Sequence, residues 1–135
     1  MITAVDSSVL IDVFGADPHF GAASASALRV CLNEGAVVAN EVVWSETRAA
    51  FGADDEFFHA MQTAGISYSP TSQKTATLAG ATWKKYRASG GQRIRVIADF
   101  LIGAHAAAQC DRLLTRDRGY YRKYFGRLVI VSPTA

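Results

Sequence analysis

The alternation of apolar and polar positions divides the chain into short apolar runs and longer segments with helical periodicity. Runs with the length of buried strands occur at 2–5, 36–39, 66–69, 112–115 and 128–131. Helical patterns occupy about 9–14, 21–32, 41–50, 54–63, 73–87 and 98–109. Strands that alternate with helices favour a parallel sheet covered on both faces. We therefore expect an α/β fold, a three-layer α/β/α sandwich with a short, mainly parallel central sheet.

Polar residues and glycines indicate where some of these segments begin or weaken. Ser7 or Ser8 is suited to cap the first helix, and Asn40 the helix after the second strand, because their side chains accept hydrogen bonds from free N–H groups. Gly103 lies within the helix predicted at 98–109. A glycine there costs about 1 kcal/mol of helix propensity relative to alanine.

Composition narrows the class of protein. With 135 residues, 50% of them hydrophobic and 19% charged, the chain fits one compact domain, which we expect to span 1–135. The apolar stretches are too short to span a membrane, and Asp6 and Asp12 interrupt the first one, so we expect a cytoplasmic protein without a membrane partner. Cys31 and Cys110 lie far apart without CxxC spacing, which gives little support to a zinc site or a disulfide.

The net charge of +2 conceals an asymmetry between the two parts of the chain. Residues 1–83 contain three Lys or Arg and nine Asp or Glu, a net charge of −6, whereas residues 84–135 contain eleven bases and three acids, a net charge of +8. The basic part has the charge needed to bind a polyanion such as RNA. A set of solvated helix faces would explain the same pattern equally well.

Two carboxylates come just after predicted strands. Asp6 follows the strand at 2–5, and Asp117 lies two residues beyond the strand at 112–115. Ligands of parallel α/β sheets bind beyond the carboxyl ends of the strands. An Asp in such a position is also a common turn former or helix cap, so each acid taken alone leaves both roles open.

Two further acids lie in predicted helices. Glu46 shares a helical face with Val42, Ala49 and Ala50. We therefore expect its carboxylate to point toward the apolar side and to meet a cation there. Asp99 begins the most apolar helix of the chain, and helix capping explains its presence in part. Glu41, in the first turn of its helix, is adequately explained by the helix dipole.

If Asp6, Glu46, Asp99 and Asp117 converge, their mutual repulsion must be offset. Hard divalent cations with oxygen ligands are the natural partners of such a cluster, and Mg²⁺ commonly bridges protein acids to a substrate phosphate. A site of this kind can activate water and stabilise charge on a departing oxygen. Phosphodiester hydrolysis is therefore the chemistry that fits the four acids.

Four blocks of the sequence resemble those of a known family. The blocks are DSSVLID at 6–12, NEVVWSETRAAF around Glu46, IADFLIGAHA at 97–106 and LLTRDRGYYRKYFGRLVIV at 113–131. In this order and spacing they resemble the acidic blocks of PIN-domain ribonucleases, and more narrowly the VapC toxins of toxin-antitoxin pairs. The resemblance covers essentially the whole chain.

The resemblance implies an endoribonuclease whose Asp6, Glu46, Asp99 and Asp117 bind one or two Mg²⁺ or Mn²⁺ ions. It also implies a structured RNA substrate such as tRNA or rRNA, a homodimer, and a cognate VapB-like antitoxin that blocks the acidic pocket. Ser8 and Thr115 match positions that support the acids. The arginines of the basic part that would contact RNA phosphates are Arg93, Arg95, Arg112, Arg116 and Arg118.

Two other functions compete with this interpretation. A phosphoacceptor receiver domain is also a small α/β fold with acids at the strand ends, but it needs a phosphorylatable Asp after a central strand and a Lys after a late one. Here the strand at 36–39 ends in Asn40, and the late strand is followed by Arg116 and Asp117. The stronger alternative is a catalytically silent PIN-like module that binds RNA or protein, because acidic residues in a sequence do not prove turnover.

Overall fold

A computed structural model describes residues 1–90 and 96–133. Within them, five strands form one parallel sheet in the order β3-β2-β1-β4-β5, with every neighbouring pair parallel. The strands are β1 (Ile2–Val5), β2 (Ala36–Ala39), β3 (Ile66–Tyr68), β4 (Arg112–Leu114) and β5 (Val129–Val131). The first strand is therefore the central one, between β2 and β4.

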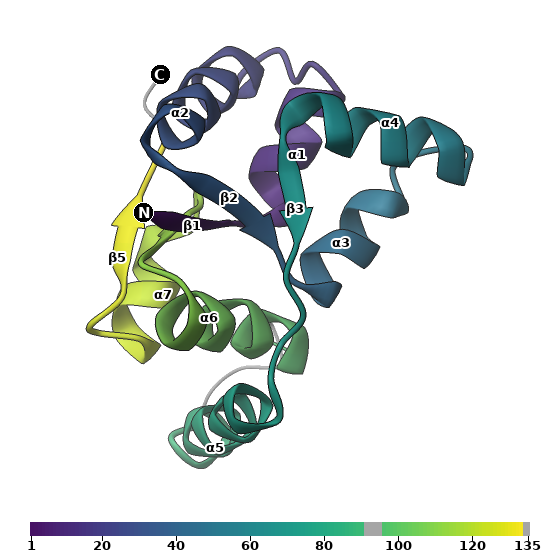
Figure 1. The fold of residues 1–135 in the computed structure, drawn as a ribbon. Helices are drawn as coiled ribbons and strands as arrows, with labels where there is room; N and C mark the ends of the chain where they lie inside the picture. Colours follow the sequence, from purple (N-terminus) through teal and green to yellow (C-terminus); the bar gives the residue numbers. More distant parts are fainter. Residues whose placement is uncertain (91–95, 134–135) are drawn as a thin grey trace.

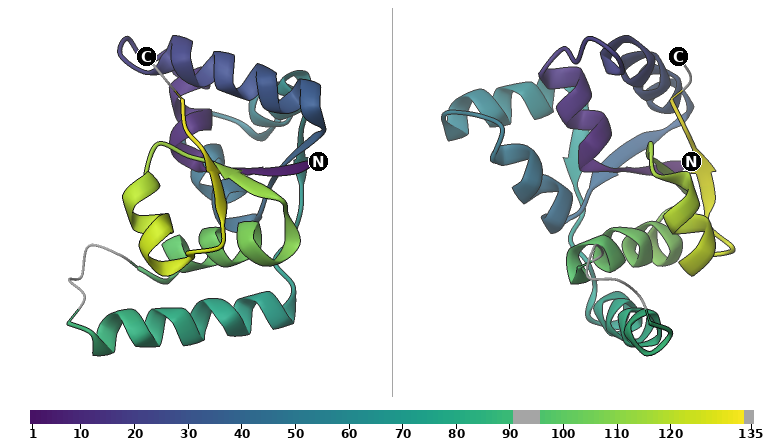
Figure 2. Two further views of the ribbon diagram at one scale, coloured as in Figure 1. Left: turned by 90° about the vertical axis from the view of Figure 1, so that its left-hand side faces the viewer. Right: turned by 180° about the vertical axis from the view of Figure 1, so that it is seen from behind.

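Seven helices are described between these strands. They are α1 (Ser7–Phe14), α2 (Gly21–Glu34), α3 (Glu41–Arg48), α4 (Asp54–Ala64), α5 (Gln73–Ala88), α6 (Ile97–Gln109) and α7 (Arg118–Tyr124). Helices α1 and α2 lie on one side of the sheet, α6 and α7 lie on the other, and α5 lies outside α6 (Figures 1 and 2). The predicted three-layer α/β/α arrangement with a parallel central sheet is confirmed. No helix in the described ranges is long and apolar enough to cross a membrane.

The carboxyl ends of the two central strands, β1 and β4, are joined by the hydrogen-bond ladder. Val5 is in register with Leu114, and the Asp6 N–H donates to the Leu114 carbonyl at 2.9 Å. On the next strand, the Thr115 N–H donates to the Val131 carbonyl at 3.0 Å. These pairings bring residues just after β1 to residues just after β4, although the two segments are far apart along the chain.

Local capping confirms one sequence prediction and corrects another. Asn40 caps α3, with its Oδ1 accepting from the Val43 N–H at 3.1 Å. The N-cap of α1 is Asp6, and neither Ser7 nor Ser8 has that position, because the helix begins one or two residues earlier than expected. The Asp6 carboxylate makes no capping bond, and this leaves its oxygens available for other partners.

Gly103 is explained by packing. A Cβ built on Gly103 would lie 2.3 Å from Cε2 of the Phe125 ring, which is far closer than van der Waals contact. The ring of Phe125 is itself buried in the core, so it has little room to retreat. The missing side chain at this position, which costs helix propensity, therefore allows α6 to pack closely against the end of α7.

Candidate acidic active site

Asp6 is the most buried of the four predicted acids, with 7% of its surface exposed. Its Oδ2 accepts a 2.7 Å hydrogen bond from the Thr115 hydroxyl. Burial is the main cause that raises the pKa of Asp6, and the nearby charges of Asp99 and Asp117 raise it further, although bonds from Thr115 and from the Ser7 backbone lower it. The carboxylate thus has hydrogen-bond donors, and it forms no ion pair with a cationic side chain of the described residues.

Thr115 connects two of the acids. Its side chain is fully buried; the hydroxyl donates to Asp6 and accepts the Asp117 N–H at 3.0 Å. Asp117 is the N-cap residue of α7, so the same hydroxyl fixes both the Asp6 carboxylate and the start of that helix. The geometry agrees with the supporting role expected for Thr115, and that role stays a prediction.

Glu46 reaches the site from α3, but not in the way predicted. Val43 and Thr47 form the buried face of this helix, whereas Glu46, Ala49 and Ala50 are exposed. Among the described residues, the partner of Glu46 is a hydroxyl: Ser7 Oγ donates to Glu46 Oε1 at 2.9 Å. The prediction of an inward-pointing Glu46 was wrong, because the apolar stripe of α3 lies one residue away from the one we assigned.

The carboxylate of Glu46 nonetheless interacts with the other acids. Partial desolvation raises its pKa, the Ser7 hydrogen bond lowers it, and the charges of Asp6 and Asp99 raise it. Ser7 Oγ also lies 3.4 Å from Asp6 Oδ1, so one hydroxyl stands between the two carboxylates. Ser7 was not among the predicted site residues, and its place next to Ser8 after the first strand was the available signal.

Asp99 lies at the start of α6, where its Oδ2 accepts the Val96 N–H at 3.0 Å. This bond confirms that helix capping accounts for part of its role. The other part is electrostatic, since the charge of Asp99 raises the pKa values of Asp6, Glu46 and the buried Tyr121 phenol. Tyr121, whose pKa is raised first by burial and then by the acids, is a neighbour of the site that sequence reasoning missed.

A pocket of about 390 Å³ opens at this end of the sheet and is lined by Asp6, Ser8, Arg116 and Asp117. Ser8 Oγ is buried there and has no hydrogen-bond partner within the described part of the chain. A buried polar atom without a partner is costly, and an unused oxygen beside two carboxylates suits a hard cation. The oxygen donors therefore match the chemistry of Mg²⁺ or Mn²⁺.

The spacing of the acids is wider than that of a finished metal site. Among residues 1–90 and 96–133, no group of three or more His, Cys, Asp or Glu is arranged to hold a metal ion. The charges of Asp99 and Asp117 raise the pKa of Asp6, and those of Asp6 and Asp99 raise the pKa of Glu46, so the four carboxylates share one region. A divalent ion bound there would offset their mutual repulsion.

The predicted RNA-binding arginines lie in different surroundings. Arg116 lines the acidic pocket. Arg112 lies at the amino end of β4, where its Nε donates to Thr3 Oγ1 at 2.9 Å and its Nη2 lies 2.9 Å from Glu34 Oε2. These contacts hold Arg112 at the opposite end of the strand from the acids, and we do not include it in the proposed RNA surface. Arg93, Arg95 and the side chain of Arg118 lie outside what the structure describes.

Arg116 is paired with an acid that the sequence analysis did not place in the site. Its Nε donates to Asp12 Oδ2 at 2.7 Å and its Nη2 donates to Asp12 Oδ1 at 3.1 Å. Asp12 is buried in α1 and also accepts a 2.9 Å bond from Ser24 Oγ. The signal for this pair was a charged residue between apolar helical neighbours, which requires a buried partner.

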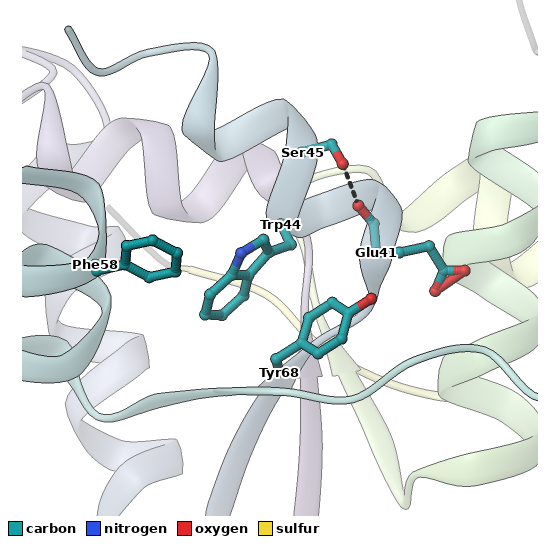
Figure 3. Close-up of a pocket in the computed structure, with 5 residues that line it drawn as sticks. All are labelled: Glu41, Trp44, Ser45, Phe58 and Tyr68. Carbon is teal, nitrogen blue, oxygen red and sulfur yellow. Dashed lines mark hydrogen bonds between the residues drawn. The ribbon is translucent and has the colours of Figure 1, made fainter. Parts of the chain in front are cut away.

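A second pocket, of about 450 Å³, has a different character (Figure 3). Its walls are Trp44, Phe58 and Tyr68, and the Trp44 and Tyr68 ring centroids lie 5.2 Å apart. Glu41 is the acid in its lining, and the Glu41 Oε1 accepts from the Thr71 N–H and hydroxyl at 2.9 and 2.7 Å. Burial raises the pKa of Glu41, but the hydrogen bonds from Thr71 oppose this effect and the pKa is lowered overall. The carboxylate of the second pocket is thus already hydrogen-bonded, so the Asp6 pocket is the candidate for metal chemistry.

The chain resembles several solved structures over nearly its whole length. A chain of the crystal structure of VapBC2 from Rickettsia felis bound to a DNA fragment from their promoter matches with a TM-score of 0.74 and 15% identity, over 98% of both chains. A chain of VapBC-1 from nontypeable Haemophilus influenzae matches with a TM-score of 0.73 and 15% identity, over 100% of both. A chain of FitAcB from Neisseria gonorrhoeae matches with a TM-score of 0.68 and 18% identity, over 98% of both.

At these identities the likeness concerns the fold. A search among curated proteins found no match. The model of the family described as "PIN domain" matches residues 3–126, which include most of β1, all of β4 and all four acids. The chain therefore belongs to the PIN domain family.

Proposed function

We propose that this PIN-domain protein is a Mg²⁺- or Mn²⁺-dependent endoribonuclease toxin that hydrolyses phosphodiester bonds in structured RNA such as tRNA or rRNA. PIN domains are generally nucleases, which favours this class of activity. The observation that supports it most is the state of Asp6. Its carboxylate is buried beside the charges of Asp99 and Asp117, and it forms no ion pair with a described residue.

In the proposed site, Asp6, Glu46, Asp99 and Asp117 hold the metal, and the bound ion supplies activation of a water and stabilisation of charge on the phosphate. The chain's own residues hold these acids in place. Thr115 orients Asp6 and the start of α7, Ser7 orients Glu46, and the Val96 N–H orients Asp99. The Ser8 hydroxyl, which has no partner in the described residues, is available to the ion or to a water beside it.

The test is cleavage of total RNA in the presence of Mn²⁺, followed on a denaturing gel. We expect cleavage by the wild-type protein and its loss on Asp6→Asn or Asp99→Asn, because each change removes a negative ligand. Asp54→Asn is the matched control, since Asp54 is an exposed acid paired with Arg48 at 2.7 Å. Cleavage that persists in both site variants would overturn the assignment.

The alternative function is a catalytically silent PIN-like module that binds RNA or protein. One observation favours it: no three acids of the described ranges stand ready to hold an ion. Isothermal titration with Mn²⁺ distinguishes the two, because a nuclease site must close around the ion whereas a silent module need not bind it. RNA binding without Mn²⁺ uptake or cleavage would establish the silent module.

We also propose a cognate VapB-like antitoxin as the partner and a homodimer as the assembly. The similar chains come from structures described as VapBC and FitAcB. Co-expression with the product of a short neighbouring gene should yield a stable complex without RNA cleavage, and light scattering should give twice the chain mass. An isolated monomer that no neighbouring product inhibits would favour a stand-alone RNA-processing enzyme in the cytoplasm.

A further inference from the structure

The pocket beside Asp6 contains a guanidinium that two side chains hold in place. Arg116 makes the bidentate pair with Asp12, and its Cζ lies 4.1 Å from the centroid of the Phe20 ring. The Arg116 side chain is 34% exposed, whereas the Asp12 side chain is only 5% exposed. The acid is thus a buried anchor, while part of the guanidinium still faces the pocket.

The supports of Arg116 are themselves held in place. Ser24 of α2 donates to Asp12, which ties the anchor to a second helix. Asp17 Oδ2 accepts the Phe20 N–H at 2.7 Å, and this bond fixes the turn that carries the ring. Arginine can satisfy this arrangement because its planar fork binds a carboxylate with two N–H groups and stacks on an aromatic face, which lysine cannot do.

Two features distinguish this pair from an ordinary structural ion pair. First, Arg116 is the cationic member of the pocket lining among the described residues, next to Asp6 and Asp117. Second, Nε and one N–H of Nη2 serve Asp12, so the remaining N–H groups of the guanidinium are available to another acceptor. A phosphate entering a pocket lined by carboxylates is repelled, and a fixed donor at its edge would offset that repulsion.

We propose that Arg116 is a pre-positioned phosphate-binding residue, and that Asp12 and Phe20 are positioning residues that aim it at the RNA strand beside the Asp6 pocket. The inference rests on the proposed ribonuclease function and deepens it, since it assigns the substrate contact next to the acids. Asp12 largely neutralises Arg116, so the contact acts through directed hydrogen bonds more than through long-range attraction. Its contribution is therefore orientation of the phosphodiester.

The experiment measures binding and turnover separately. Binding of fluorescein-labelled tRNA is followed by anisotropy in EDTA, where cleavage is prevented, and kcat and KM are measured in Mn²⁺. Arg116→Lys should weaken binding about 10-fold, which corresponds to about 1.4 kcal/mol, and should lower kcat. Arg48→Lys is the matched control, since Arg48 pairs with an exposed Asp and does not line the acidic pocket, and it should leave both quantities unchanged.

Asp12→Asn gives a readout that a purely structural role would not produce. It removes one negative charge and frees the guanidinium, so the KM for tRNA should stay constant or fall while kcat falls about 10-fold. Phe20→Leu, which leaves the ion pair intact, should lower kcat about 3-fold. Thermal unfolding followed by circular dichroism verifies that each variant is folded; where a variant is not, the Phe20→Leu result decides.

The outcomes separate this inference from the function on which it rests. Wild-type cleavage with unchanged binding and turnover in folded Arg116→Lys and Phe20→Leu would overturn the phosphate contact and leave the nuclease intact. Arg116-dependent tRNA binding without any Mn²⁺-dependent cleavage would overturn the nuclease and support the contact. A wild-type protein that neither binds nor cleaves tRNA would overturn both.

Discussion

A buried aspartate lies near each end of helix α1, and the two carboxylates have different partners. Asp12, near the end of the helix, is neutralised by a bidentate bond to Arg116 and a further bond from Ser24. Asp6, at the beginning, receives hydroxyl and backbone donors while Asp99 and Asp117 add negative charge nearby. The carboxylate with a cationic partner and the carboxylate without one among the described residues therefore lie only six positions apart.

The difference distinguishes a carboxylate paired within the protein from one held ready for an external cation. A buried carboxylate is expensive, and a cationic partner offsets that cost, as at Asp12. The absence of such a partner in the described surroundings of Asp6 leaves a cost that a divalent ion can relieve. Proteins accept costs of this kind at functional sites, where titratable groups with shifted pKa values gather.

Removing the charge of Asp6 is the strongest test of the difference between the two aspartates. Asp6→Asn should reduce RNA cleavage by at least about 100-fold, because removing a ligand exceeds the 10–100-fold cost typical of losing a supporting residue. The same change should leave the urea midpoint of the metal-free protein equal or higher, since it removes a desolvated charge. A large loss of stability with full activity would contradict the role assigned to Asp6.

A smaller effect is expected from the hydroxyl that supports Asp6. Thr115→Val preserves the shape of a fully buried side chain but removes its bonds to Asp6 and to the Asp117 N–H. Mn²⁺ affinity by titration calorimetry, or cleavage rate, should fall about 10–100-fold. Ser24→Ala, which removes the hydroxyl bound to Asp12, is the matched control and should leave Mn²⁺ affinity unchanged. Equal losses in the two variants would contradict the distinction.

The compensated aspartate should show the reverse profile. Asp12→Asn removes the charge paired with Arg116 and should lower the free energy of unfolding by about 2 kcal/mol, below the 3–5 kcal/mol of a fully buried pair because Arg116 can turn toward solvent. Urea unfolding measures this. Mn²⁺ affinity should be preserved. A stability loss below about 0.5 kcal/mol would show that the Asp12 pair resembles a surface ion pair.

The smallest effect is the pH dependence of metal-free stability. Burial and neighbouring acids raise the pKa values of Asp6 and Glu46 above their ordinary values of 3.8 and 4.5, so the folded protein binds more protons than the unfolded chain between the ordinary and the raised values. Stability should therefore fall as the pH rises through that window. In EDTA, the urea midpoints of the wild type and Asp6→Asn should diverge with rising pH; parallel curves would argue against the raised pKa of Asp6.

Much of the fold follows from local patterns. The five apolar runs became strands because their length and composition suit a sheet buried on both faces, and Asn40 capped its helix as expected. The order of Asp6 and Asp117 after β1 and β4 follows from the rule that parallel strands end at one edge. These features depend on residues close together in the sequence or on a general property of parallel sheets.

Other features depend on long-range packing, which periodicity does not report. The face of α3 was misassigned because Val42 and Val43 are both apolar. Contacts with the rest of the fold determine which of the two is buried, and it is Val43. The Asp12 and Arg116 pair joins residues 104 positions apart. From the sequence, Gly103 only costs α6 helix propensity; its reason is the Phe125 ring that packs against it. Each of these three features can be predicted only when it is known which segment packs against the residue.

The bond from Thr115 to Asp6 spans 109 positions of the chain. During synthesis from the N-terminus, the Asp6 carboxylate therefore emerges well before the hydroxyl that orients it and the β4 strand that flanks it. A ribosome making the proposed toxin would thus hold a polypeptide with an incomplete, inert site until β4 has emerged. The late arrival of β4 would protect the translating machinery, with its own RNA, from the product it is making.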